Sequence, residues 1–263
     1  VGFLIGFRTG GLFAGMVAAA FTGGIFALVL GYLTTSLKMN QFVVGLALFF
    51  IGTGLSTLLP KLAIGVTMVQ PTVPTLVDVP IPLLSQIPVL GPVLFSQNIL
   101  VYFSVVLTVG LWWFLYRTRI GLEVRSVGEN PMAADSLGVN VKLIRYAATI
   151  IGGMLIGLAG AYLPMVYTGT FTEGMVRGRG WIAIALTFFG AWSPLPIFFG
   201  SLFFAAIEVL SFRVQVGGSL IPYQFLQMLP YIATILVMVF SFRRSRVPGF
   251  LGNNYDREKR SLA

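Results

Sequence analysis

The sequence contains no cysteine and no histidine among its 263 residues. Without cysteine the chain can form no disulfide and has no thiolate nucleophile, and without histidine it has no imidazole base. These two residue types also supply most of the protein ligands of zinc and haem. We therefore expect the chain to hold no metal and no other cofactor of its own, and to use none of the enzyme chemistries that need these groups.

Charge is scarce as well. Charged residues make up 10% of the chain and apolar residues 57%, whereas a soluble domain has about 25% charged residues. So few charges cannot give a folded chain a hydrated surface, and the sequence predicts an integral membrane protein. A transmembrane helix needs about 20 apolar residues, and the chain has room for about 6–7 of them. The expected fold class is an all-α, polytopic membrane helical bundle.

Apolar runs give the positions of these spans. They cover about residues 11–36, 42–59, 98–116, 146–167 and 224–242. The stretch 60–97 holds half of the 14 prolines and almost no charge, which predicts an extended loop that folds back on itself, with a short interfacial helix left open. In the fourth run, glycines are expected to let a neighbouring helix approach closely; they are Gly152, Gly153, Gly157 and Gly160.

The stretch 181–212 is interrupted by the residues AWSP, and the part before the break is too short to span. A half-length helix is tolerated only where it is buried in protein or lies beside a cavity. Two topologies remain open between residues 168 and 243. One has three crossings with the break on or near the cytoplasmic side, and the other has one crossing and a re-entrant 181–212 segment.

The net charge of +9 comes from basic residues in loops beside the apolar runs. This placement follows the positive-inside rule and predicts a lipid bilayer, not a nucleic acid, as the partner of the basic residues. Cations concentrate in the loop 117–145 and in the tail after residue 242, but are few in 60–97 and 168–180. The loop 117–145 and the tail are therefore predicted to be cytoplasmic.

The chain begins at Val1 inside an apolar stretch, without an initiator methionine or a signal-peptide pattern. We expect further helices upstream of it. Residues 1–242 are predicted to form the transmembrane domain and residues 243–263 a basic cytoplasmic tail. The polar composition of the tail favours a solvated, flexible end over a binding element.

No motif for chemistry is visible. None of the four lysines follows a glycine, so the phosphate-binding sequence GxxxxGK[ST] is absent, and HExxH, GxSxG and GxGxxG do not occur. The chain is therefore not expected to be an enzyme, and any active transport would draw its energy from a partner or from an ion gradient.

One acidic residue, Glu208, lies within a predicted span. Ion-coupled transporters keep such residues in the membrane, which leaves open an ion-coupled secondary transporter of a small neutral solute. The other interpretation is a pair with Arg213 or an interhelical hydrogen bond. The uncharged Asn40, Gln41 and Thr53 would suit the path of a neutral, hydroxyl-rich solute, or would form interhelical hydrogen bonds.

The loop sequence VGENPMAADSLGVN, residues 127–140, has the pattern of a short helix. Asn130 suits the N-cap, Pro131 the first helical position and Gly138 the C-terminal stop. A helix of about two turns is marginal in water, so it must dock against something. It is either a lever that transmits force or a mere interfacial connector.

Several segments resemble ABC import permeases of the ribose, branched-chain amino acid and nucleoside group. They are GLEVRSVGENPMAADSLG (121–138), MNQFVVGLAL (39–48), GGMLIGLAGAYL (152–163), GRGWIAIALTFFGAWSP (178–194) and IPYQFLQMLPYIATILVMVF (221–240). In that group 121–138 is the cytoplasmic coupling loop. The combination is most similar to the nucleoside and simple-sugar permeases.

The resemblance implies a permease subunit in the bacterial cytoplasmic membrane that translocates nucleosides or simple sugars. Its implied partners are a separate cytoplasmic ATPase, which binds the ATP, a second and related permease, and an extracytoplasmic solute-binding lipoprotein at the outer loops 60–97 and 168–180. The residues implied to lie at or beside the ATPase contact are Glu129, Asn130, Pro131, Ala133, Ala134, Asp135 and Gly138.

Overall fold

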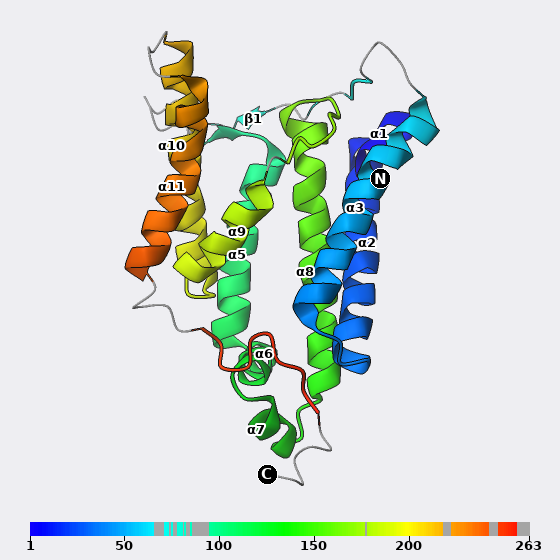
Figure 1. Ribbon diagram of the computed structural model, residues 1–263, viewed down its shortest axis with the longest axis vertical. Coiled ribbons are helices and arrows are strands. Elements are labelled where there is room, and N and C mark those ends of the chain that lie inside the picture. Colours follow the sequence, from blue (N-terminus) through cyan, green and yellow to red (C-terminus); the bar gives the residue numbers. More distant parts are fainter. Residues whose placement is uncertain are drawn as a thin grey trace. The chain divides into compact units, whose positions relative to one another are not determined.

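The computed structural model describes residues 1–65, 71–73, 75, 78–80, 82, 85, 95–176, 178–217, 222–241 and 247–256. Nearly every regular element in these residues is a helix (Figure 1), which confirms the predicted all-α class. Strands β1 (Val79–Pro80) and β2 (Ser96–Gln97) form one short antiparallel pair. This pair confirms that the stretch 60–97 folds back on itself, while the short interfacial helix left open there falls outside the described residues.

The chain forms two compact units. The first comprises Val1–Phe103, Leu122–Val176 and Phe250–Ala263, and the second comprises Ser104–Gly121 and Arg177–Gly249. Residues 250–256, which follow the predicted boundary at residue 242, pack within the first unit.

The first unit holds five helices in its described residues, of which α2, α3 and α8 follow the predicted apolar runs. They are α1 (Gly2–Thr9), α2 (Leu12–Gly31) with its π-helical extension η1 (Tyr32–Ser36), α3 (Gln41–Ile64), α7 (Pro131–Ser136) and α8 (Val141–Tyr162) with its π-helical extension η3 (Leu163–Tyr167). Helices α5 (Ile99–Arg117) and α6 (Arg119–Glu129) have residues in both units. The second unit also holds α9 (Arg179–Phe189), α10 (Pro194–Val216) and α11 (Tyr223–Ser241).

Within the described residues, five helices are long and apolar enough to cross a membrane. They are Leu12–Ser36, Gln41–Ile64, Ile99–Arg117, Val141–Tyr167 and Pro194–Val216. Helix α11, with 19 residues, corresponds to the last predicted span. The predicted polytopic membrane bundle is therefore confirmed.

Helices α2 and α8 lie side by side in the first unit (Figure 1), and glycine makes their close approach possible. A Cβ atom on Gly153 would collide with Ala27, and one on Gly157 would collide with the backbone of Ala19. Gly152 and Gly160 have open space where a Cβ would be. The predicted close approach therefore holds for Gly153 and Gly157 but not for the other two, which lie on faces turned away from α2.

The core of the first unit lies where α1, α2 and η3 meet. Phe3, Met16 and Ala161 are buried there around Met165, which has 0% exposure. Val73, from the proline-rich stretch, completes this cluster. The core therefore lies at the end of the unit that carries the two predicted outer loops.

Two differences from the sequence expectations concern helix ends, and a third is an additional helix. Helix α3 passes through Pro60 and ends at Ile64, because a proline in a helix removes one backbone donor but does not force the helix to end there. Helix α8 begins at Val141, capped by the Asn140 side chain. Helix α6 was not expected at all. Its apolar residues Ile120, Val124 and Val127 recur at helical spacing inside an otherwise polar segment.

In the second unit, α9 has 11 residues, which gives a length of about 16 Å, so it cannot cross the hydrocarbon alone. Helix α10 has 23 residues and lies against α9 and α11 (Figure 1). The break between α9 and α10 is a tight turn in which Ala191 and Trp192 have positive φ angles of 46° and 55°. The predicted half-length helix region is thus present, with the full-length span after the break.

Candidate functional site

Helix α7 is the predicted short helix, and its start is built as the sequence indicates. The Asn130 Oδ1 atom accepts a hydrogen bond from the Ala133 N–H at 3.0 Å, and Pro131 occupies the first turn. Gly138 follows the helix with φ +84°, a left-handed conformation that glycine adopts without strain. The helix has six residues, Pro131–Ser136, so its stability must come from what it packs against.

The residues of α7 divide into a buried and an exposed set. Pro131 is almost fully buried and Ala134 has 2% exposure, as their spacing of three residues places them on one face of the helix. Ala133 and Gly138 are exposed, and Asp135 is half-buried. Of the residues implied to lie at or beside an ATPase contact, Pro131 and Ala134 therefore hold α7 to its own chain.

The exposed set includes two apolar residues that the sequence analysis did not single out. Leu137 is 85% exposed and Met132 is 40% exposed. These two side chains give the exposed surface beside Pro131 and Ala134 an apolar part. Helical position could have identified Met132, which lies off the face of Pro131 and Ala134. It could not have identified Leu137, because a spacing of three from Ala134 predicts the buried face, and Leu137 leaves that face only because the helix ends at Ser136.

The buried face of α7 packs on a small cluster that includes the end of the chain. Ala134 lies with Val127 of α6, Val141 of α8 and Tyr255, which has 8% exposure, and Figure 1 shows the C-terminal segment in red beside this region. The prediction of a solvated, flexible tail is therefore wrong for residues 250–256. Two aromatic residues in a polar segment, Phe250 and Tyr255, were the signal for docking.

These contacts also place the loop 117–145 and residues 250–256 on the same side, as the distribution of cations predicts. Which side of the membrane this is stays a prediction, based on the positive-inside rule.

The cap of α7 gives a first testable prediction. Replacing Asn130 by alanine removes the acceptor for the Ala133 N–H, and a lost N-cap costs about 1 kcal/mol. We expect amide hydrogen exchange in α7 to become about fivefold faster and solute uptake to fall. Asn130→Ser should keep most of the protection, because serine is also a good N-cap.

The matched control is Asn140→Ala, which removes the equivalent cap of α8. Helix α8 has 22 residues and packs along α2, so exchange in α7 should not change in this variant. Equal exchange rates in Asn130→Ala and in the unaltered protein would contradict the assigned capping role.

The two predicted outer loops meet at the other end of the first unit. Lys61 Nζ forms an ion pair with Glu173 Oε1 at 3.0 Å, and the Val73 N–H donates to the Gly169 carbonyl at 2.8 Å. Thr72 and Thr170 form a β-bridge. The two loops are therefore joined through Lys61, Thr72 and Val73 on one side and residues 169–173 on the other, which the sequence could not show.

Two of the four residues considered for a translocation path, Gln41 and Thr53, belong to α3, and a third, Asn40, precedes it. Asn40 caps this helix, since its Oδ1 atom accepts from the N–H groups of Phe42 and Val43 at 2.9 and 3.2 Å. Gln41 reaches the Asn253 carbonyl at 3.5 Å. Thr53 lies about 20 Å farther along the helix, where its hydroxyl donates to the Phe50 carbonyl. The first two therefore lie beside the docked C-terminal segment, and a role in the path stays a prediction.

Glu208, the fourth residue, lies on α10 in the second unit. Its Oε1 atom accepts from Arg179, the first residue of α9, at 2.5 Å. Of the two interpretations left open, the interhelical hydrogen bond is therefore the one that the structure shows, and the pair with Arg213 is not formed. Nothing local in the sequence could indicate this pair, because its members are 29 residues apart. The side chains are 40% (Arg179) and 54% (Glu208) exposed, which is unusual for charges in apolar helices.

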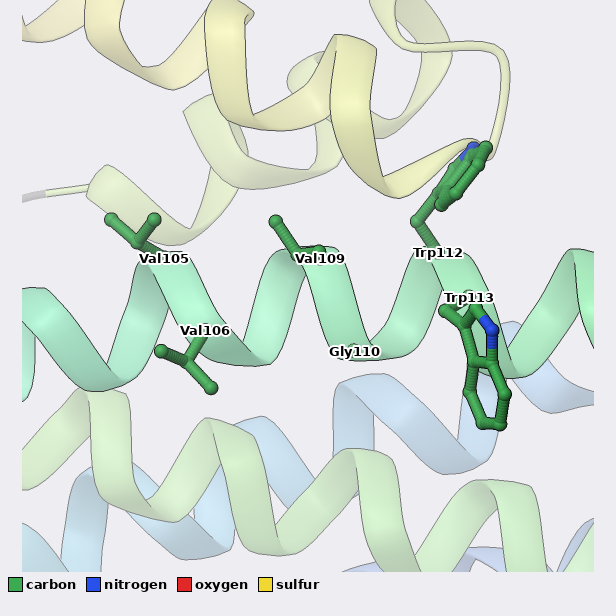
Figure 2. Close-up of a pocket in the computed structure, with 6 residues that line it drawn as sticks. All are labelled: Val105, Val106, Val109, Gly110, Trp112 and Trp113. Atoms are coloured by element: carbon green, nitrogen blue, oxygen red, sulfur yellow. The ribbon is translucent and has the colours of Figure 1, made fainter.

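A shallow depression of about 520 Å³ lies on α5. Figure 2 shows Val105, Val109 and Trp112 extending from one side of the helix, and Val106 and Trp113 from the other. The indole N–H groups are the polar side-chain groups of this lining. The surface therefore offers a hydroxyl-rich solute almost nothing to bind, and it is a poor candidate for the solute site.

Comparison with known proteins shows the family of this chain. The family described as branched-chain amino acid transport system, permease component, matches residues 1–241. The chain belongs to this permease family. The membership confirms the resemblance drawn from the sequence, and it makes the protein a membrane permease component and not an enzyme.

Three relatives are similar to this permease. Nucleoside ABC transporter permease protein NupC of Lactococcus lactis is 40% identical over 68% of this chain and 57% of its own length. Guanosine ABC transporter permease protein NupQ of Bacillus subtilis is 34% identical over 93% of this chain and 78% of its own length. Putative glucose ABC transporter permease protein TsgC13 of Haloferax volcanii is 32% identical over 98% of this chain and 85% of its own length.

The chain thus spans less than two thirds of the lactococcal relative but more than three quarters of the other two. No solved structure matches it.

Proposed function

We propose that this permease translocates nucleosides, with simple sugars as the alternative, as a membrane subunit of an ABC importer in the cytoplasmic membrane. The names of the three relatives support both solute classes. The observation that carries the mechanism is helix α7, a short capped helix with one face buried on its own chain and an exposed apolar surface beside it.

The exposed surface of α7 is the proposed contact with a separate ATPase, which binds the ATP. Met132 and Leu137 supply the apolar part of the contact, and the exposed Ala133 and Gly138 let a partner approach the backbone. The polar rim consists of Glu129, Asn130 and Asp135. Pro131 and Ala134 would contribute indirectly, because their burial keeps α7 packed against its own chain.

Two further partners complete the proposed importer. A second, related permease would supply the facing half of the path, because the exposed apolar helices of one chain cannot enclose it. An extracytoplasmic solute-binding lipoprotein would dock on the joined loop surface at Lys61, Glu173 and the Thr72–Thr170 bridge. When ATP closes the ATPase pair, the two α7 helices would approach each other and move the permeases between inward-open and outward-open states.

The Arg179–Glu208 pair is the proposed polar element of the path. A charged side chain facing lipid at mid-membrane costs at least about 2.5 kcal/mol, so the exposed parts of this pair should face water or the second permease. Both side chains can form hydrogen bonds with sugar hydroxyl groups.

Exchanging the two charges tests whether the Arg179–Glu208 pair lines the path or only stabilises the structure. Glu208→Ala leaves Arg179 without this ion pair, so uptake should fall about twofold to fivefold, as expected for a partly exposed pair. The double variant Arg179→Glu/Glu208→Arg restores an ion pair. If the pair faces the path, the double variant assembles but its KM for uptake of guanosine rises several-fold. An unchanged KM in a fully active double variant would assign the pair to structure alone.

The source of energy tests the proposed function itself. The complete complex, with receptor and ATPase, would be reconstituted in liposomes and supplied with radiolabelled guanosine. We expect uptake with ATP inside the liposomes, none with a non-hydrolysable analogue, and no effect of a protonophore. Competition by glucose would favour sugars as the solute. Uptake that a protonophore abolishes while ATP is maintained would overturn the proposal in favour of an ion-coupled secondary transporter.

A further inference from the structure

We propose that residues 250–256 form a strut that joins the buried face of α7 to the turn between α2 and α3, and so transmits the displacement of α7 to these two helices. The inference rests on the proposed function, since it assumes that an ATPase moves α7. It assigns a positioning role to a segment whose composition predicts a solvated end.

One end of the strut lies under α7. Tyr255 is buried in the cluster with Ala134, Val127 and Val141, and the Phe250 N–H donates to the Gly128 carbonyl at 3.1 Å. Aromatic burial of this kind is rigid, because a tyrosine has only two side-chain torsions. A push on α7 toward its own chain therefore acts directly on Tyr255.

The other end holds the turn between α2 and α3. The Asn254 side-chain amide donates to the carbonyls of Lys38 and Met39 at 2.5 and 3.1 Å. Lys38 Nζ also forms an ion pair with Asp256 at 2.7 Å. Tyr255 lies between Asn254 and Asp256 in the sequence. Neighbouring residues of the strut therefore contact α7 and the turn.

A third set of contacts fixes the strut to α8. The Arg145 guanidinium donates to the Asn253 carbonyl at 3.2 Å and lies 5.3 Å from the centre of the Phe250 ring. Cation–π contacts of this kind contribute about 0.5–1 kcal/mol at exposed sites. The segment is thus held at α7, α8 and the turn, through apolar burial, hydrogen bonds and an ion pair.

The turn between α2 and α3 is closed tightly enough to pass a displacement on to these helices. Lys38 has a positive φ angle of 55°, and the Met39 N–H donates to the Leu33 carbonyl at 3.0 Å, so the turn is tightly closed. Helix α2 beyond it packs along α8 through Gly153 and Gly157. Movement of the turn would therefore reach the long helices and not be absorbed by a loose loop.

The first experiment removes the α7 end of the strut in the reconstituted complex. In Tyr255→Ala we expect ATP hydrolysis to continue while guanosine taken up per ATP hydrolysed falls about fivefold or more, within the usual range of coupling between sites. Tyr255→Phe should keep the ratio, because it keeps the ring. Truncation after Gly249 should behave like Tyr255→Ala, and truncation after Asp256 like the unaltered chain.

The second experiment needs no change in the buried cluster and therefore decides the matter if Tyr255→Ala fails to fold. Lys38→Asp and Asp256→Lys each place like charges together at the turn, and each should lower the transport ratio about twofold to fivefold. The double variant Lys38→Asp/Asp256→Lys should restore it.

Unchanged transport ratios in Tyr255→Ala and in both single charge variants would overturn the strut. Failure of the double variant to recover would do so too. Absence of ATP-driven guanosine or glucose uptake in the unaltered complex would instead refute the proposed function, so the two failures are distinguishable.

Discussion

Replacing Ala134 by lysine should abolish ATP-driven uptake and association with the ATPase, while the chain still inserts into the membrane. Ala134 has 2% exposure and packs against Val127, Val141 and Tyr255. A lysine there would overfill the site and bury a charge without a partner, which costs several kcal/mol. A six-residue helix cannot remain seated against that cost, so uptake should fall more than about 100-fold. Co-purification with the ATPase and uptake into liposomes measure both effects.

The matched control for this variant is Ser136→Lys, which adds the same charge to an exposed position of the same helix. Hydrogen exchange of residues 250–256 should increase strongly in Ala134→Lys, because Tyr255 loses its packing partner, but not in Ser136→Lys. Normal uptake by Ala134→Lys would refute the assignment of α7 as the helix that couples the permease to the ATPase.

Replacing Leu137 by glutamate should release the ATPase without disturbing the permease itself. The Leu137 side chain is 85% exposed, so the substitution should change the stability of the chain by less than about 0.5 kcal/mol. If an ATPase pocket covers this side chain, a charge there costs at least about 2 kcal/mol of binding free energy, or about 30-fold in affinity. Titration of the detergent-solubilised permease with ATPase measures the change.

The control for Leu137→Glu is Leu122→Glu, which makes the same change at a 60% exposed position on α6. ATPase affinity should remain within about twofold of the unaltered value there. Equal losses in both variants would show that added negative charge, and not the contact at α7, weakens binding.

The sequence by itself determined the fold class and most of the helices. An all-α membrane bundle follows from 10% charged and 57% apolar residues, because such a chain is stable only where its surface meets lipid. The short helix α7 also followed from local chemistry, since Asn130, Pro131 and Gly138 act through their own backbone neighbours. Local rules of this kind need no knowledge of the rest of the chain.

Only the tertiary structure decided which face of α7 is available to a partner. The burial of Ala134 depends on Tyr255, which is more than 100 residues away in the sequence. The ion pair of Glu208 with Arg179, and the docking of residues 250–256 on the turn at Lys38, have the same origin. Each joins residues that no helical or strand period relates, so it arises from packing between distant segments and not from local pattern.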